Sequence, residues 1–426
     1  MASATEDGAA AARDAGALAE PTERVGRGWT AALSLANGGI WVGWFGPIQI
    51  LLALQAAELH PAGMSKETLL AWVTGVGAAV SLVANPFFGA LSDRTAGRFG
   101  RRTPWIAAGT VGGAAGLVLL SGADSVAALL GGWCLVQLAL NAAFAAVTAA
   151  VPDRVPYGRR GWVGGWLGLA QMLGVVAGTG LATAAGGITA GYLACAAFTV
   201  LAAVPYLLLG RDLPLARRPP FTWRGFARGF WIRPRAYPDL GWAWLTRFLI
   251  NLGNAVALLY LLYYLRDVLH YGGEDGKPED GVLTLTAVNA VMVLVTVVVG
   301  GIWSDRTGRR KPFVLWSGVL IAAATGLLAF WQTWAGAVTA AVLLGIGFGV
   351  FTAVDFALMT QVLPAAADRG KDLGVINIAN ALPQVLAPAI AAPIVTHLGG
   401  YSVLYTVAAL LGLAGAVLVH RIHGVD

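Results

Sequence analysis

Long apolar runs constrain this chain more than any other feature. A helix needs roughly 20 apolar residues to cross the hydrocarbon core of a bilayer, and the sequence contains twelve runs of that kind. Because only helices and closed barrels satisfy their own backbone groups in lipid, the runs predict an all-α integral membrane protein with twelve transmembrane helices. The predicted spans are residues 29–57, 68–92, 103–121, 124–150, 162–184, 190–210, 240–266, 282–304, 312–331, 334–362, 373–396 and 400–420.

The scarcity of charge supports a membrane protein. Only 12% of the 426 residues are charged, whereas a soluble domain carries about a quarter. Charged side chains are therefore too few to cover a soluble surface of this size. Glycine is abundant, with 57 residues, and small residues allow membrane helices to pack closely.

The basic residues predict the orientation of the chain. With the N-terminus inside, 24 of the 28 Lys and Arg residues fall in cytoplasmic segments, and three fall outside. Basic residues gather on the cytoplasmic side of membrane proteins. We therefore expect a multi-pass plasma-membrane protein with both termini in the cytoplasm, and we attribute the net charge of +6 to this bias rather than to nucleic-acid binding.

Composition also divides the chain into segments. Residues 1–28 are rich in alanine and mixed charges, which predicts a disordered cytoplasmic tail, and residues 421–426 form a second short tail. Residues 211–239 predict a cytoplasmic linker between two halves, 29–210 and 240–420. The Arg, Trp and Phe residues of this linker also permit an interfacial segment on an anionic leaflet, and both interpretations stay open.

The two halves repeat one another. The segment GALSDRTAGRFGRRTPW at 89–105 returns as GIWSDRTGRRKPF at 301–313, so that Asp93 and Asp305 are 212 positions apart. The same offset separates Pro152 from Pro364, and an offset of 213 separates Gln171 from Gln384. A fixed offset indicates an internal duplication, which predicts two pseudo-symmetric six-helix bundles.

These repeated loops carry a resemblance. G-x-x-S-D-R-x-G-R-R after the second helix of each half resembles the signature loop of the major facilitator superfamily, and the resemblance covers about residues 29–420. It implies a secondary transporter that rocks its two halves around a central site. The first copy departs from the commonest form of the motif by an extra residue within 93–98. This longer form, which ends at 100–104, is similar to the glycoside–cation symporter and sucrose-transporter branches. The segments 353–364 and 371–388 resemble bacterial permeases near those branches.

We expect the two signature loops to act as gates. A glycine one turn before each aspartate favours close helix approach, and each aspartate can accept hydrogen bonds from a neighbouring helix N-terminus. The alternative is that the arginines only follow the charge bias. The predicted gating residues are Gly89, Asp93, Arg94, Gly97, Arg98, Arg101 and Arg102 in the first half, and Gly301, Asp305, Arg306, Gly308, Arg309 and Arg310 in the second.

Two ionisable residues stand well inside the predicted spans, Arg247 and Asp355. Such groups are costly in lipid and point to function. In the superfamily, the first and fourth helices of each half line the cavity, and these residues lie on those helices at similar depth. Three roles remain open: a structural ion pair, a proton carrier Asp355 tuned by Arg247, and direct contact with the solute. Burial raises a carboxylate's proton affinity and a neighbouring guanidinium lowers it.

Polar stripes at helical spacing extend the predicted cavity. Amides bond hydroxyl groups in both senses, and aromatic faces cover the apolar faces of a sugar, so the stripes favour a small polar, sugar-like solute. The alternative is interhelical hydrogen bonding. The predicted coupling and substrate residues are Arg247, Asn251, Asn254, Thr352, Asp355, Asn377, Asn380, Gln384, Asn37, Trp41, Trp44, Gln137 and Asn141.

Other classes of function lack their motifs. The sequence contains no phosphate-binding G-x-x-x-x-G-K-[ST] loop and no H-E-x-x-H or Ser-His-Asp arrangement, so we expect no enzyme activity, no cofactor and no metal site. The expected partners are a small-molecule solute, protons and the lipid bilayer, and we expect a monomer. A drug or metabolite exporter of the same fold, a channel and a non-transporting sensor are the alternatives.

Overall fold

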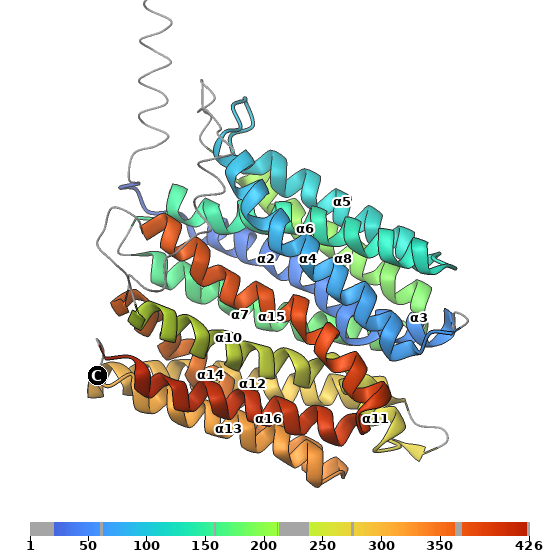
Figure 1. Ribbon diagram of the computed structural model, residues 1–426. Coiled ribbons are helices and arrows are strands. Elements are labelled where there is room, and N and C mark those ends of the chain that lie inside the picture. The colour runs from blue at the N-terminus through green and yellow to red at the C-terminus, as the bar shows by residue number, and fades with distance from the viewer. Residues whose placement is uncertain are drawn as a thin grey trace, which may run out of the picture. The chain divides into compact units, whose positions relative to one another are not determined.

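The computed structural model describes residues 21–59, 63–156, 159–210, 212, 238–273, 277–362 and 369–423. Most of the predicted N-terminal tail and nearly all of the predicted linker lie outside these residues. Within them the chain forms helices joined by short loops, with no strand (Figure 1). The elements are α2 (Arg27–Gly46), η1 (Pro47–Leu51), α3 (Leu52–Leu59), α4 (Lys66–Asp93), α5 (Thr103–Ser121), α6 (Val126–Arg154), α7 (Arg160–Ala184), α8 (Ile188–Leu209), α10 (Pro238–Leu259), α11 (Leu261–Asp267), α12 (Pro278–Thr307), α13 (Lys311–Phe330), α14 (Trp334–Val362), α15 (Arg369–His397), α16 (Gly400–Leu418) and η5 (Val419–Arg421).

These helices confirm the predicted all-α membrane class. Eleven helices of the described chain are long and apolar enough to cross a bilayer, and α10 with α11 makes a twelfth when this pair, bent by 43°, counts as one span. The first span runs through a π-helical segment that starts at Pro47. Proline lacks the N–H that would continue the helical ladder, and a π segment is one way to absorb that loss.

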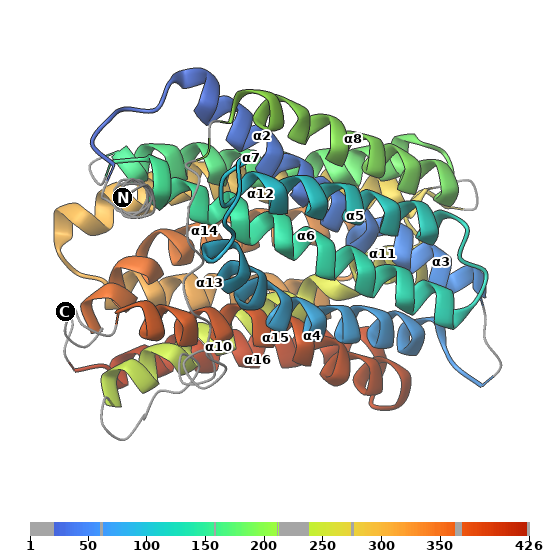
Figure 2. The same cartoon turned by 90° about the horizontal axis from the view of Figure 1, so that it is seen from above.

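The chain divides into two compact units with a common packing scheme. One unit comprises residues 1–47 and 80–222, and the other comprises 48–79 and 223–426. In the first unit α2 packs along α7 and α8, and α5 packs along α6 and α8; in the second, α10 packs along α15 and α16, and α13 along α14 and α16 (Figures 1 and 2). These four helix pairs therefore recur in the two halves, in keeping with the sequence duplication, while α12 also packs along α14 in the second unit.

Glycine sets the close approach of α2 to α7. A Cβ added at Gly178 would lie 2.9 Å from the backbone of both Gly46 and Val42. Real side chains almost never come so close, so the two helices meet backbone to backbone at this position. Small residues at such crossings supply the dispersion contacts that hold membrane helices together.

The end of α4 that is remote from its signature loop belongs to the second unit. Lys66 Nζ lies 2.6 Å from Asp267 Oδ2 on α11, and the Tyr260 hydroxyl donates to the carbonyl of Glu67. The Tyr263 hydroxyl donates to the carbonyl of Ala53 on α3. Residues 48–79 therefore share a hydrogen-bonded contact region with the second sequence half, although they belong to the first.

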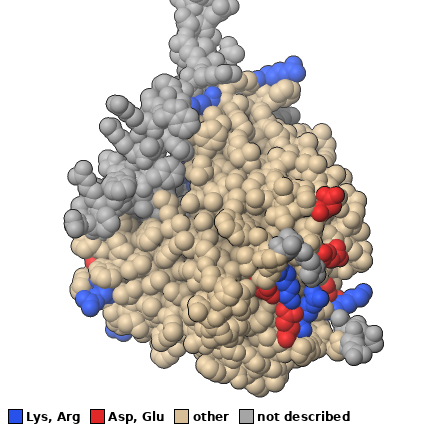
Figure 3. All heavy atoms as spheres, turned by 45° about the vertical axis from the view of Figure 1, so that its right-hand side comes forward, with Lys and Arg blue, Asp and Glu red and all other residues tan. Residues whose placement is uncertain are grey.

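Charged side chains are sparse on the face of the molecule that Figure 3 shows. Figure 3 shows a face that uncharged residues cover almost completely, with Lys, Arg, Asp and Glu in a few places near its edges. Large apolar side chains such as Leu208, Phe330 and Trp316 are 79%, 81% and 64% exposed. Exposed apolar side chains on membrane-spanning helices are suited to lipid contact.

Candidate functional site

A charged pair lies buried in the second unit. Arg247 on α10 and Asp355 on α14 come together with 2.8 Å between Nη1 and Oδ2. The side chains are 12% and 7% exposed. The two groups form an ion pair that is not aligned as a hydrogen bond. Removing one partner of such a pair leaves an uncompensated buried charge, which typically costs about 3–5 kcal/mol.

Two amides from the predicted stripes surround the guanidinium. Arg247 Nε donates to Asn380 Oδ1 on α15 over 2.8 Å, and Asn251 Nδ2 donates to the same oxygen over 3.1 Å. Asn251 also donates to the carbonyl of Ala379 over 3.4 Å. Three helices, α10, α14 and α15, therefore meet at one polar cluster, which we call the Arg247 cluster: Arg247, Asn251, Asp355 and Asn380.

Other predicted residues of this half lie outside the cluster's hydrogen bonds. Asn254 is half-buried on α10. The Thr352 side chain is exposed, and its hydroxyl donates to the Phe348 carbonyl one turn earlier. Gln384 is exposed on α15, and the side chain of Asn377 lies outside the described residues. The regular spacing of the stripe thus marks one helix face without bringing each of its members to the charged pair.

In the first unit, the predicted tryptophans belong to an aromatic cluster. The ring centroids of Trp41 and Trp44 on α2 lie 5.5 Å apart, and Phe144 on α6 lies 5.9 Å and 5.5 Å from them in edge-to-face geometry. The indole Nε1 atoms of both tryptophans are buried without a partner in the described chain. Aromatic faces beside free N–H donors form a surface that can bind a ring with hydroxyl substituents.

The remaining amides of the first unit bond between helices. Asn37 donates to the carbonyl of Leu167 on α7 over 3.0 Å, while its Oδ1 is buried and unpartnered among the described residues. Asn141 donates to the carbonyl of Gln137 in its own helix and accepts from Ser81 and Asn85 on α4. The Gln137–Asn141 stripe thus contacts α4, and the sequence offered no signal for its two partners there.

The first signature loop is a closed charge network. Arg102 Nη2 lies 2.6 Å from Asp93 Oδ1, Arg102 Nε lies 2.7 Å from Asp153 Oδ2, and Arg101 Nη2 lies 2.9 Å from Asp153 Oδ1. Arg102 also donates to Ser92. Burial disfavours the charged guanidinium of Arg102, but the bonds and charges of Asp153 and Asp93 outweigh this effect, so the pKa of Arg102 is raised.

The carboxylate at the N-terminus of α5 differs from the expected one. Asp212, just beyond α8, accepts hydrogen bonds from the backbone N–H groups of Arg102 and Thr103. Asp93 instead accepts from the Arg102 side chain. Gly100, at φ 82°, leaves room for Asp212, because an added Cβ would collide with the Asp212 side chain. The second residue of the predicted linker 211–239 thus caps a helix of the first unit.

The second signature loop keeps one contact of the first. Arg310 Nη1 donates to Ser304 Oγ over 2.8 Å, as Arg102 does to Ser92 in the first loop. This shared hydrogen bond aligns Arg310 with Arg102 when the two loops are compared. Gly308, at φ 66°, ends α12 in the left-handed conformation that glycine adopts at low cost. Arg306 and Arg309 are exposed, and the Asp305 side chain lies outside the described residues.

The remaining loop residues fit the expected pattern only in part. Arg94 donates to the carbonyl of Ala90, whereas Gly97 and Arg98 are exposed. Gly89 and Gly301 face Ala145 and Ala353, and an added Cβ would lie 4.0 Å and 3.9 Å from them. These are ordinary contact distances, so space alone does not require glycine at either position, in contrast to the expected close approach.

The acidic partners of the first loop, Asp153 and Asp212, were not among the predicted gating residues. Asp153 follows Pro152, one of the repeat markers. This neighbouring marker was the one feature of the sequence that could have pointed to Asp153. Nothing in the sequence of the linker distinguished Asp212 from its neighbours. Among the described residues, no group of three or more His, Cys, Asp and Glu is arranged to hold a metal ion.

Comparison with known proteins places this geometry in a family. The chain matches the sequence model of the Major Facilitator Superfamily over residues 33–293 and 278–423. No curated protein matches it.

Several solved structures share the fold at low identity. The peptide transporter POT in complex with sulfate is 14% identical, with TM-score 0.76 over 96% of this chain and 97% of that one. The nucleoside transporter NupG is 11% identical, with TM-score 0.73 over 92% and 98%. The human organic anion transporter MFSD10 (TETRAN) is 15% identical, with TM-score 0.66 over 92% and 99%.

Proposed function

Because this chain belongs to the major facilitator superfamily, we propose that it is a proton-coupled secondary transporter of a small polar solute. The observation that carries the proposal is the buried Arg247–Asp355 pair. The pair occurs in one half only, since the repeat offset places Ala143 opposite Asp355. A charged pair confined to one half is not needed by the duplicated scaffold.

The pair supplies a chemical device for coupling. A carboxylate gives up its proton readily beside a guanidinium and holds it more tightly when the guanidinium is removed or engaged elsewhere. Of the two kinds of group, only a carboxylate exchanges a proton in proteins, so Asp355 is the proton carrier of the proposal. A motion that changes the 2.8 Å separation of the pair then changes the protonation of Asp355.

The polar and aromatic clusters support a hydroxyl-rich solute. The amides of Asn251 and Asn380 present both donors and acceptors in the second unit. Trp41, Trp44 and Phe144 present aromatic faces in the first. Amides that bond hydroxyls and rings that cover apolar sugar faces are the usual components of such sites, and the loop motifs favour a sugar-like solute.

The test is transport by purified protein in proteoliposomes, with a panel of sugars, nucleosides, peptides and organic anions. We expect Asp355→Asn to abolish accumulation driven by a proton gradient while keeping exchange of solute down its own gradient. Asp280→Asn, which neutralises an exposed carboxylate at the start of α12, is the matched control and is expected to keep both activities.

A double variant separates coupling from structure. Arg247→Gln with Asp355→Asn removes both charges and leaves none unpaired. If the pair is only structural, the double variant regains accumulation. If Asp355 carries the proton, the variant regains expression and monodispersity but not accumulation. Full gradient-driven uptake by the folded double variant would refute the proposal.

The proposed orientation has its own test. After replacement of Cys134 and Cys195, single cysteines at Thr95 and Thr307 are expected to be protected from an impermeant maleimide in intact cells. A cysteine at Ser65, at the other end of α4, is expected to be labelled. The opposite pattern would reverse the proposed topology.

A further inference from the structure

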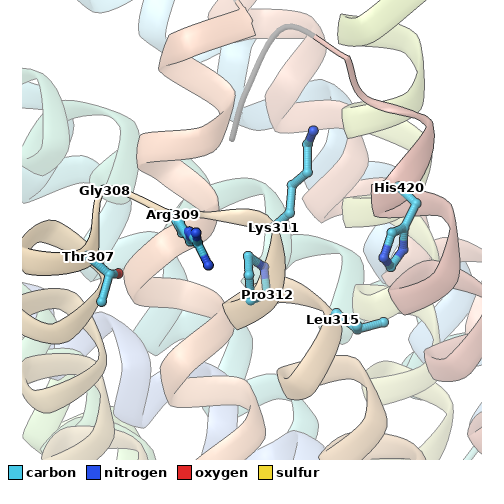
Figure 4. Close-up of a pocket in the computed structure, with 7 residues that line it drawn as sticks. All are labelled: Thr307, Gly308, Arg309, Lys311, Pro312, Leu315 and His420. Carbon is cyan, nitrogen blue, oxygen red and sulfur yellow. The ribbon is translucent and has the colours of Figure 1, made fainter.

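A basic surface cavity lies beside the second signature loop. Its volume is about 700 Å³, and seven residues line it: Thr307, Gly308, Arg309, Lys311, Pro312, Leu315 and His420. Figure 4 shows Arg309 and His420 on either side of Lys311 and Pro312. The lining contains two permanent positive charges and an imidazole but no carboxylate. We call it the loop cavity.

In the first half, a carboxylate of the chain itself lies at the position that is equivalent to the loop cavity. The shared bonds Arg102–Ser92 and Arg310–Ser304 align Arg101 with Arg309 and Thr103 with Lys311. Arg101 lies 2.9 Å from Asp153. The residue after the repeated proline is Ala365 in the second half, so that position itself carries no carboxylate; Asp368, three residues further on, lies outside the described residues.

Arg309 and Lys311 of the loop cavity have no acidic partner among the described residues. Neither Arg309 nor Lys311 has an ion pair or a side-chain hydrogen bond in the described chain, and Lys311 adds a charge where the first half has the neutral Thr103. His420 Nδ1 lies 3.3 Å from the carbonyl of Val417, so its other ring nitrogen is available to a ligand. A charge surplus of this kind favours an anion from outside the chain.

The backbone at this position also lacks the acceptor that the first half provides. Asp212 accepts from the N–H groups of Arg102 and Thr103 at the start of α5. At the start of α13 no carboxylate of the described residues accepts from the N–H of Lys311. Anions bind readily at helix N-termini. At the N-terminus of α13, the basic side chains of Arg309 and Lys311 add positive charge.

We propose that the loop cavity binds a phosphate group, which takes the place that Asp153 and Asp212 occupy in the first half. A guanidinium binds phosphate oxygens through paired N–H groups and an ammonium as a point charge, so Arg309 and Lys311 supply complementary contacts. The phosphate belongs either to a phospholipid headgroup, whose apolar part meets Pro312 and Leu315, or to free phosphate. The proposal is independent of the transported solute.

Ligand-induced stabilisation of delipidated, detergent-purified full-length protein tests the proposal, because a ligand that binds the folded state raises its unfolding temperature. The probes are inorganic phosphate, with chloride at equal ionic strength as its control, and dioleoylphosphatidylglycerol, with a phosphate-free monoglucosyl diacylglycerol as its control. Stabilisation by the phospholipid alone identifies the headgroup as the source, and stabilisation by inorganic phosphate shows that the free anion suffices. If neither inorganic phosphate nor the phospholipid stabilises the protein, the proposal is overturned.

Variants assign the effect to the loop cavity. Arg309→Gln with Lys311→Thr, which restores the threonine of the first half, is expected to raise the half-maximal ligand concentration about tenfold or more, since bonds to charged groups are lost. Arg309→Lys with Lys311→Arg keeps the charge and is expected to retain stabilisation. Arg421→Gln removes one positive charge beside His420, outside the cavity lining, and is the charge-matched control for Lys311→Thr alone. It is expected to change the concentration less than about twofold.

Each result with the variants is decisive. Unchanged stabilisation in the Arg309/Lys311 double variant overturns the proposal, and so does an equal loss in Arg421→Gln, which would indicate non-specific attraction. If the double variant is not monodisperse, Lys311→Thr alone is measured against Lys311→Arg, and equal ligand responses of these two would overturn the proposal.

Discussion

The two signature loops have the same motif but satisfy their charges differently. In the first half Arg101 and Arg102 are buried against Asp93 and Asp153, and Asp212 caps the following helix. In the second half the Arg310–Ser304 bond persists, whereas Arg309 and Lys311 line an open cavity. The two copies thus keep the Arg–Ser hydrogen bond of the loop but differ in the carboxylates that neutralise its basic residues. One loop is closed within the chain, and the other has room for a ligand.

The largest expected effect concerns the shared carboxylate of the first loop. Asp153→Asn should lower the free energy of unfolding by about 3–5 kcal/mol, because it leaves buried arginine side chains short of their partner. Thermal or denaturant unfolding of the purified protein measures the loss. Asp280→Asn is the exposed control, and an equal effect of the two substitutions would contradict the idea of a closed network.

A smaller effect is expected from the gate itself. Asp93→Asn removes a charge-assisted bond to Arg102, worth about 1.5–3 kcal/mol, which shifts a conformational balance more than tenfold. We expect uptake to fall while equilibrium solute binding stays largely intact. Undiminished uptake would count against a gating role for Asp93, and equal losses of binding and uptake would point to misfolding instead.

The helix cap of the first loop is expected to contribute less. Asp212→Ala removes the acceptor for two backbone N–H groups, and losing a helix cap costs about 0.5–2 kcal/mol. Gly100→Ala should destabilise to a similar degree, since its φ of 82° and the Asp212 side chain both oppose a Cβ. Gly97→Ala, where nothing lies within 4 Å, is the matched control.

Combining the substitutions sharpens this comparison. If Gly100 is required chiefly by the docked Asp212, Gly100→Ala should cost less in an Asp212→Ala background, because neighbouring effects are not additive. Strict additivity in the unfolding free energies would show that the backbone conformation of Gly100 alone sets the cost.

The smallest effect is expected in the second loop. In detergent without phosphate or phospholipid, Lys311→Thr should change the free energy of unfolding by no more than about 0.5 kcal/mol, because the side chain has no ion pair or hydrogen bond with the described residues. The same unfolding measurement tests it. A large loss without ligand would mean that Lys311 has a structural role within the chain, and the contrast between the loops would disappear.

The sequence by itself determined the membrane class, the spans and the duplication. Apolar length and the repeat offset are properties of consecutive residues, and lipid leaves a lone segment few structures other than a helix. Arg247 and Asp355 were also recognisable without a structure, because charge within an apolar run is costly wherever it packs.

The tertiary structure decided which groups meet. Arg247 reaches Asp355 and Asn380 across helices more than 100 residues apart in the sequence, while Thr352 and Gln384, on the predicted stripes, remain exposed. Helical spacing fixes the face of one helix but not the rotation of its neighbour. The capping carboxylate Asp212 was invisible for the same reason, since its place depends on where the chain runs after α8 and not on any residue beside it.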